Sequence, residues 1–197
     1  MSTRAYHHGN LRTALLEQAE RSVREHGVEH LSLRELARRT GVSHGAPRRH
    51  FADRQALLDA LAEAGFERLG VDLRRAVEGA GEQFEPRLLA TAGAYVRFAT
   101  RDAALLELMF AGKHKQGSGA LQEAGERAFS VIRGLIEQGQ AEGVLEPGEP
   151  ERVGLVLFAT MQGIAALVTG GIVDGAHVEG LVADAITHFL RSSRAAG

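Results

Sequence analysis

The sequence predicts an all-α protein: a three-helix head at the amino end that contains a helix-turn-helix, followed by a helical body. Three observations lead to this prediction. Apolar residues recur at three- and four-residue spacing along most of the 197 residues, and the alternation typical of strands is missing. Two closely spaced helix starts stand in residues 31–54. Glycine and proline then divide the remainder into segments of helix length.

The first helix is expected from about Leu11 to His26. Asn10 can cap its start, and Gly27 can end it in a left-handed conformation. Its apolar stripe is Leu15, Leu16, Ala19 and Val23, which we expect to pack on Leu36, Val42 and Phe51.

The second and third helices follow at once. Ser32 precedes Glu35 by three residues, which is the pattern of a capping box, and Gly41 ends this second helix. Ser43 can cap the third helix, where Pro47 lies early enough to be tolerated. We therefore expect a short third helix with an irregular start.

The third helix has the composition of one that enters the major groove of DNA. Such a helix brings its first residues to base edges, while cations and backbone amides meet phosphates. The residues expected near base edges are Ser43, His44, Gly45 and Ala46. The residues expected mainly at phosphates are Arg34, Arg48, Arg49, His50 and Arg54, and Ser32 is a further expected DNA contact.

This stretch, LSLRELARRTGVSHGAPRRHFADRQALL (31–58), resembles the TetR family of bacterial transcriptional regulators, and YHHGNLRTALLEQAERSVREHGVEHLS (6–32) resembles that family's first helix. The resemblance covers about residues 6–62. One position departs, because the family usually has a tyrosine that touches the phosphate backbone where this chain has Arg48. Arginine can donate to phosphate or bind guanine through two hydrogen bonds, and both interpretations stay open.

Charge is distributed unevenly along the chain. Residues 1–58 hold ten arginines and six acidic residues, a charge of +4, whereas the remainder carries −6. A basic head on an acidic body suits a protein whose head alone meets a polyanion. Ordinary solvated helix faces are the alternative explanation of this feature when it is taken alone.

The body is predicted to be helical throughout. Asp53 can cap a long helix that ends at Gly79, and residues 112–119 read as a glycine-rich polar loop. The other expected helices are Glu85–Arg101, Ala103–Phe110, 120–142, 151–170 and 178–194. We place a domain boundary between residues 1–54, the DNA-binding head, and 55–197, the body for ligand binding and dimerisation.

The segment 151–170 is apolar on most sides, so two different surfaces must cover it. One would be its own core and the other a second subunit, giving a four-helix bundle with the last helix. The expected interface residues are Leu157, Ile164, Val168, Val182, Ile186 and Phe189. The segment LFATMQGIAAL is similar to the Trp–His–Gly type of C-terminal domain in part of the TetR family, with Phe158 and Gln162 at the tryptophan and histidine positions and Gly163 retained.

Aromatic and methionine residues of the body are candidates for a mostly apolar ligand pocket. They are Tyr95, Phe98, Leu105, Met109, Phe110, Phe129, Ile132, Phe158, Met161 and Gln162. Residues of these types at helical spacing also pack ordinary cores, so the pocket rests mainly on the family resemblance.

Several function classes find no support in the sequence. The chain has no cysteine, which excludes disulfides and thiolate chemistry. No catalytic constellation or metal-ligand cluster is recognisable, and no cofactor is expected. The start MSTRAYHHGN lacks an apolar signal segment, and no uninterrupted apolar run reaches 18 residues. We therefore expect a cytoplasmic protein that is not an enzyme and has no membrane partner.

The resemblance implies a homodimeric regulator that binds double-stranded operator DNA, most simply a repressor released by a small molecule. Ligand in the body would tilt the helix after Asp53, so that the two heads no longer match major grooves about 34–36 Å apart. A non-specific architectural DNA-binding protein and a helical carrier of apolar small molecules are the alternatives.

Overall fold

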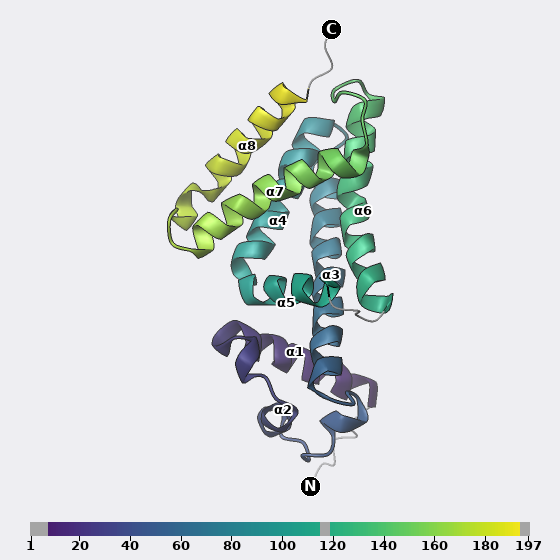
Figure 1. Cartoon of the computed structure of the whole chain (residues 1–197), viewed down its shortest axis with the longest axis vertical. Helices are drawn as coiled ribbons and strands as arrows, with labels where there is room; N and C mark the ends of the chain where they lie inside the picture. The colour runs from purple at the N-terminus through teal and green to yellow at the C-terminus, as the bar shows by residue number, and fades with distance from the viewer. Residues whose placement is uncertain (1–7, 115–118, 194–197) are drawn as a thin grey trace. The chain divides into compact units, whose positions relative to one another are not determined.

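The computed structural model describes residues 8–114 and 119–193, which form helices joined by turns, without a strand (Figure 1). The α-helices are α1 (His8–His26), α2 (Leu33–Thr40), α3 (Arg54–Gly79), α4 (Phe84–Arg101), α5 (Ala103–His114), α6 (Gly119–Ala141), α7 (Pro150–Thr169) and α8 (Val178–Ser192). The 3₁₀ helices are η1 (Val28–His30), η2 (Pro47–Arg49) and η3 (Gly175–His177). The predicted all-α fold is confirmed for the described residues.

The chain divides into two compact units. The described residues of the first unit fall within Met1–Phe66 and Ala104–Ala124, and those of the second within Glu67–Ala103 and Gly125–Gly197. Helices α3 and α6 each contribute residues to both units.

Helix α1 buries one stripe in the core of the first unit. Leu15, Ala19 and Val23 are buried as expected, as are Leu36 and Phe51, whereas Leu16 and Val42 are only half-buried. The helix begins at His8, ahead of Asn10, so the prediction of Asn10 as the cap was wrong. Gly27 follows the helix with φ 79°, as its proposed role as terminator requires.

Helix α2 is held at both ends as the sequence predicted. The hydroxyl of Ser32 accepts a hydrogen bond from the Glu35 backbone N–H at 3.2 Å. Gly41, with φ 68°, ends the helix, and the Val42 N–H donates to the Ala37 carbonyl. The side chain of Glu35 takes a different role from the expected one: its carboxylate accepts hydrogen bonds from Arg38 and Arg39.

The expected third α-helix is replaced by a tight turn, and we call residues 43–49 the recognition turn. The Ser43 carbonyl accepts from the Ala46 N–H at 2.9 Å, and the single 3₁₀ turn η2 follows. Pro47 explains the difference, because it has no N–H to give Ser43 the bond of an α-helix. Ser43 therefore contributes its backbone carbonyl, and no side-chain cap is found at the start of η2.

Helix α3 begins as predicted, because the Asp53 carboxylate accepts from the Ala56 N–H at 2.8 Å. Further along in the first unit, a Cβ added at Gly65 would lie 2.7 Å from the Met109 sulfur. A side chain at position 65 would therefore displace the Met109 side chain where α5 approaches α3.

Helix α5 continues four residues beyond the predicted Phe110, as far as His114. Part of the predicted polar loop 112–119 is therefore helical, and residues 115–118 of that loop lie outside the described residues.

In the second unit, α4 packs against both α7 and α8, which are also neighbours of each other (Figure 1). A turn with Gly171 at φ 70° and the 3₁₀ helix η3 join α7 to α8. The buried residues of α7 are Leu157, Met161, Ile164 and Ala165, and those of α8 are Val182, Ile186, Phe189 and Leu190.

The opposite side of α7 is apolar and exposed. Leu155 is 64% exposed, Val156 56% and Leu167 40%, and Ile172 in the following turn is 75% exposed. By length and composition alone α7 is also apolar enough to cross a membrane, with a mean hydropathy of 1.6. Only 22% of the 18-residue window with this hydropathy is buried, so much of the apolar surface of α7 is exposed.

The pH response of α2 provides a test of its local geometry. Hydrogen bonds from Arg38 and then Arg39 lower the pKa of Glu35 from 4.5 to about 2. A folded pKa below the unfolded one means that the interaction stabilises the head above pH 4.5 and is lost as the pH falls towards 2. The Glu35 carboxyl group, followed by its carbon-13 NMR shift, should therefore titrate with a midpoint near pH 2. Arg38→Gln removes one hydrogen bond and should raise that midpoint. A wild-type midpoint above about 4, the ordinary glutamate range, would contradict the hydrogen bonding described here.

Candidate functional site

The recognition turn is anchored by buried residues near its end and exposes the residues at its start. Pro47 and Phe51 are buried, and they fix the turn to the core of the first unit. Ser43, His44 and Gly45 are exposed, whereas Ala46 is half-buried. The short side chains at the start of the turn leave its backbone accessible to a groove wall.

Cations surround the recognition turn. Arg34, Arg48 and Arg49 are exposed, and within residues 8–114 and 119–193 none has a carboxylate at ion-pair distance. Arg38 and Arg39 differ, because both bind Glu35 and Arg39 also meets Glu25 at 3.2 Å. The structure thus separates arginines that hold α2 from arginines available to a polyanion.

Ser32 and His50 are two further residues expected to contact DNA outside the recognition turn. The exposed Ser32 uses its hydroxyl as an acceptor in the α2 cap, as described above. His50 is half-buried, and its ring lies 6.5 Å from that of Phe51.

Arg54 is the one expected phosphate contact whose guanidinium is engaged inside the head. Its Nε donates to the Leu31 carbonyl at 2.9 Å, and its Nη2 donates to the Val28 carbonyl at 2.7 Å. These bonds tie the start of α3 to η1 and the chain that leads into α2. Sequence reasoning missed this role because the acceptors are backbone atoms 23 and 26 residues away.

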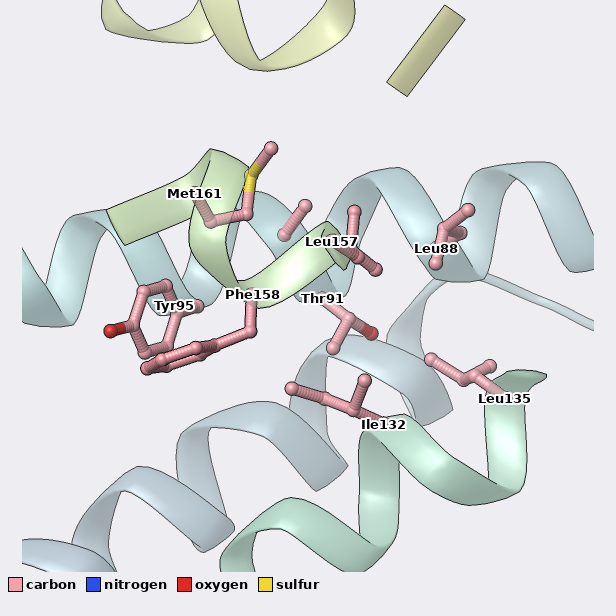
Figure 2. A pocket seen from close by; sticks show the side chains of 9 residues that line it. Leu88, Thr91, Tyr95, Ile132, Leu135, Leu157, Phe158 and Met161 are labelled. Atoms are coloured by element: carbon pink, nitrogen blue, oxygen red, sulfur yellow. The ribbon is translucent and has the colours of Figure 1, made fainter. Parts of the chain in front are cut away.

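A small apolar cavity lies in the second unit among α4, α6 and α7 (Figure 2). Its volume is about 10 Å³, which is room for about one water molecule. The lining residues are Leu88, Thr91, Ala92, Tyr95, Ile132, Leu135, Leu157, Phe158 and Met161. None of them is charged.

Aromatic rings close this cavity on one side. The Phe158 ring meets Tyr95 edge-on at 5.4 Å between centroids and Phe129 at 5.3 Å. The Tyr95 hydroxyl points away from the other lining side chains (Figure 2) and donates to the Gln162 side-chain oxygen at 2.5 Å. Burial raises the pKa of Tyr95, which keeps this hydroxyl protonated.

The expected pocket residues are thus only partly brought together. Tyr95, Ile132, Phe158 and Met161 line the cavity, and Phe129 and Gln162 support its aromatic side. Phe98, Leu105 and Met109 are buried outside the lining, and Phe110 packs edge-on against Phe66 in the first unit. Leu88, Thr91, Ala92, Leu135 and Leu157 were missed, because aliphatic and small residues at helical spacing carry no signal that separates a lining from a core.

The residues expected at a subunit interface are mostly covered by the chain itself. Leu157, Ile164, Val182, Ile186 and Phe189 are buried, and Val168 is half-buried. The exposed apolar residues stand on the other side of α7, at Leu155, Val156 and Leu167. We call these three, together with Ile172, the α7 patch.

Comparison with protein families matches both parts of the chain. Residues 15–61 match the family described as bacterial regulatory proteins, tetR family, and residues 88–191 match a Tetracyclin repressor-like, C-terminal domain. The chain therefore belongs to the TetR family of bacterial regulatory proteins. It is a DNA-binding transcriptional regulator.

Solved structures agree with this fold. A protein of unknown function from Rhodococcus sp. RHA1 is 47% identical, with 98% of this chain and 100% of that chain covered and a TM-score of 0.90. The TetR family regulator PfmR from Thermus thermophilus is 18% identical, with coverage of 94% and 98% and a TM-score of 0.71. The ketosteroid regulator KstR2 of Mycobacterium tuberculosis is 17% identical, with coverage of 94% and 96% and a TM-score of 0.66. Among curated proteins no match was found.

Replacing Arg54 separates its structural role from that of a phosphate contact. Arg54→Ala should lower the free energy of unfolding by about 1–2 kcal/mol, because two hydrogen bonds from a charged donor are lost. The matched variant Arg49→Ala should change stability by less than about 0.5 kcal/mol, as exposed substitutions do. Urea unfolding measures both, and equal stabilities of the two variants would contradict the described role of Arg54.

The buried pair Tyr95–Gln162 can be tested by a double-mutant cycle. Gln162→Leu should cost about 1–3 kcal/mol, because the Tyr95 hydroxyl loses its acceptor in an apolar setting. Adding Tyr95→Phe should recover part of that loss, since the unpaired hydroxyl is removed. Thermal and urea unfolding measure the stability of the two single variants and the double variant. If the loss in the double variant equals the sum of the two single losses, the pair is not coupled.

Proposed function

We propose that this regulator is a homodimeric, sequence-specific repressor in the cytoplasm that a small molecule releases from its operator. The observation that supports the DNA-binding part is the recognition turn, which exposes Ser43, His44 and Gly45 and is anchored by the buried Pro47 and Phe51. Its arginines have no acidic partner among the described residues. The proposed division of labour follows the predicted domains, with 1–54 as the DNA-binding head and 55–197 as the body.

In the proposed complex Ser43, His44, Gly45 and Ala46 face base edges. Arg34, Arg49 and His50, with Ser32 near the start of α2, meet phosphates. Arg54 acts mainly by fixing the start of α3, because its guanidinium already binds two carbonyls. Arg48 meets phosphate or a guanine, since its exposed guanidinium allows either contact.

We propose that the α7 patch is covered by the same patch of a second copy, with α8 completing a four-helix bundle. Burying exposed apolar side chains is the main driving force of such an interface. A lipid surface is the less favourable cover, because the neighbouring α8 exposes Asp184 and Arg191. Charged groups are costly in the hydrocarbon region of a bilayer.

The proposed effector is a neutral, largely apolar molecule that opens the cavity of the second unit. The lining is uncharged, and the Tyr95–Gln162 hydrogen bond can be exchanged for bonds to a ligand. A small-molecule site usually holds about 300–1,000 Å³, so the cavity must expand by moving its aromatic side. Binding of the effector would then weaken binding of the operator, and the reverse, by a coupling free energy of about 1–3 kcal/mol.

Selection of bound genomic fragments from the source organism tests the proposed function. A sequence-specific regulator should prefer the selected duplex over random duplex by at least about 10³-fold at physiological salt. Similar affinity for both would identify an architectural DNA-binding protein. Absence of DNA binding at low salt, with binding of apolar molecules retained, would identify a carrier.

Substitution of Arg48 distinguishes its two proposed contacts. Arg48→Tyr, which installs the family's usual residue, should keep operator binding if Arg48 meets phosphate. The salt dependence should then flatten by about one unit, because one cation is lost. Fluorescence anisotropy at several salt concentrations measures this, and complete loss of operator binding would show that Arg48 reads a base.

Disruption of the α7 patch should separate the subunits. Val156→Glu places a charge at the proposed interface, so the variant should sediment as a monomer and lose operator affinity by at least about 100-fold. Leu89→Glu is the matched control, because Leu89 is also apolar and exposed but lies on α4. A dimeric Val156→Glu variant with normal operator binding would overturn the proposed interface.

A further inference from the structure

The second unit carries a surface groove between α3 and α4 that is separate from the apolar cavity. Its volume is about 340 Å³, at the lower end of the range for small-molecule sites. The lining residues are Asp72, Arg75 and Ala76 of α3 with Ala94, Arg97, Phe98 and Arg101 of α4. Spacings of three and four residues place each set on one face of its helix.

The charges in this groove are unbalanced. Three guanidinium groups meet one carboxylate, and that carboxylate, Asp72, lies 3.6 Å from Arg101. Arg101 is also held by the buried Asp102, to which its Nε donates at 2.8 Å. Arg75 and Arg97 have no carboxylate within ion-pair distance in the part of the chain that the structure describes. Among the described residues, the Arg75 and Arg97 guanidinium groups therefore line the groove without an ion-pair partner.

The floor of the groove consists of buried apolar side chains. Phe98 is only 1% exposed, and Ala94 beside it is 7% exposed. The guanidinium of Arg101 lies over the Phe98 ring, 5.7 Å from its centroid. A guest in this groove thus meets alanine and arginine side chains, while Arg68 and Arg101 lie over the Phe98 ring beneath them.

Together these features define the chemistry of a guest. Guanidinium groups bind carboxylates and phosphates through paired, charge-assisted hydrogen bonds. We infer that the groove binds a small organic oxyanion, a carboxylate or phosphate ester, with its anionic end at Arg75 and Arg97 and its compact apolar part against Ala76 and Ala94. This site is independent of the proposed effector cavity, whose lining is uncharged.

Calorimetric titration of the full chain at low salt tests the inference. Benzoate and phenyl phosphate are the probes, benzyl alcohol is their neutral counterpart, and inorganic phosphate lacks the apolar part. The two organic anions should bind with similar affinity and should exceed both comparison molecules. Binding should weaken as salt is added.

Paired variants identify the groove as the location. The double variant Arg75→Gln/Arg97→Gln should lose at least about tenfold in affinity for the organic anions, because two charge-assisted contacts are removed. The control Arg74→Gln/Arg152→Gln removes two exposed arginines outside the groove lining and should stay within about twofold of wild type. Single variants at Arg75 and Arg97 should each show an intermediate loss.

Three outcomes would overturn the inference. Equal losses in the two double variants would indicate a general charge effect, and inorganic phosphate binding as tightly as phenyl phosphate would indicate an adventitious ion only. A parallel loss of affinity for random-sequence duplex in the groove variant alone would assign these arginines to nucleic acid.

Discussion

The structural feature with the widest consequences is helix α7, which the rest of the chain covers on one side only. Helix α7 buries Leu157, Met161 and Ile164 in the second unit, while its opposite side exposes Leu155 and Val156 by more than half. An apolar face of this kind is unfavourable in water, so it demands a partner surface. If that partner is a second copy, symmetry brings two heads into one particle. The pairing that covers an apolar helix would then also double the DNA contacts, and their affinities would reinforce one another.

In the first unit, the short recognition turn must be fixed in place while the side of it that faces solvent stays accessible. A longer α-helix would supply its own hydrogen bonds, but Pro47 prevents this. The turn is held instead by the buried side chain of its own Pro47, and from outside it by the buried Phe51 and the cap that Ser32 gives α2. Arg54 adds the two bonds that join α3 to the chain before α2. The arginines of this region thus fall into two groups. Arg38, Arg39 and Arg54 donate hydrogen bonds to acceptors within the protein, and the remaining ones stay available to a polyanion.

Sequence reasoning succeeded at several helix ends, where local rules decide the outcome, although Asn10 is not a cap and a 3₁₀ turn replaces the expected third α-helix. The helix ends at Gly27 and Gly41 and the caps at Ser32 and Asp53 follow from backbone chemistry within four residues. It failed where the answer depends on a partner far along the chain. Arg54 finds carbonyls more than twenty residues away, and only tertiary packing decides which side of α7 the rest of the unit covers. The missed cavity residues belong to the same class, because nothing local distinguishes a lining leucine from a packed one.

The direct measurement of the central claim is the mass of the wild-type protein in solution, alone and on a selected operator duplex, by sedimentation equilibrium. The chain has a mass of 21.1 kDa. The account predicts a particle of twice that mass at micromolar concentration, and an even number of chains on each duplex. A particle of 21.1 kDa that binds its duplex as a single copy would contradict it.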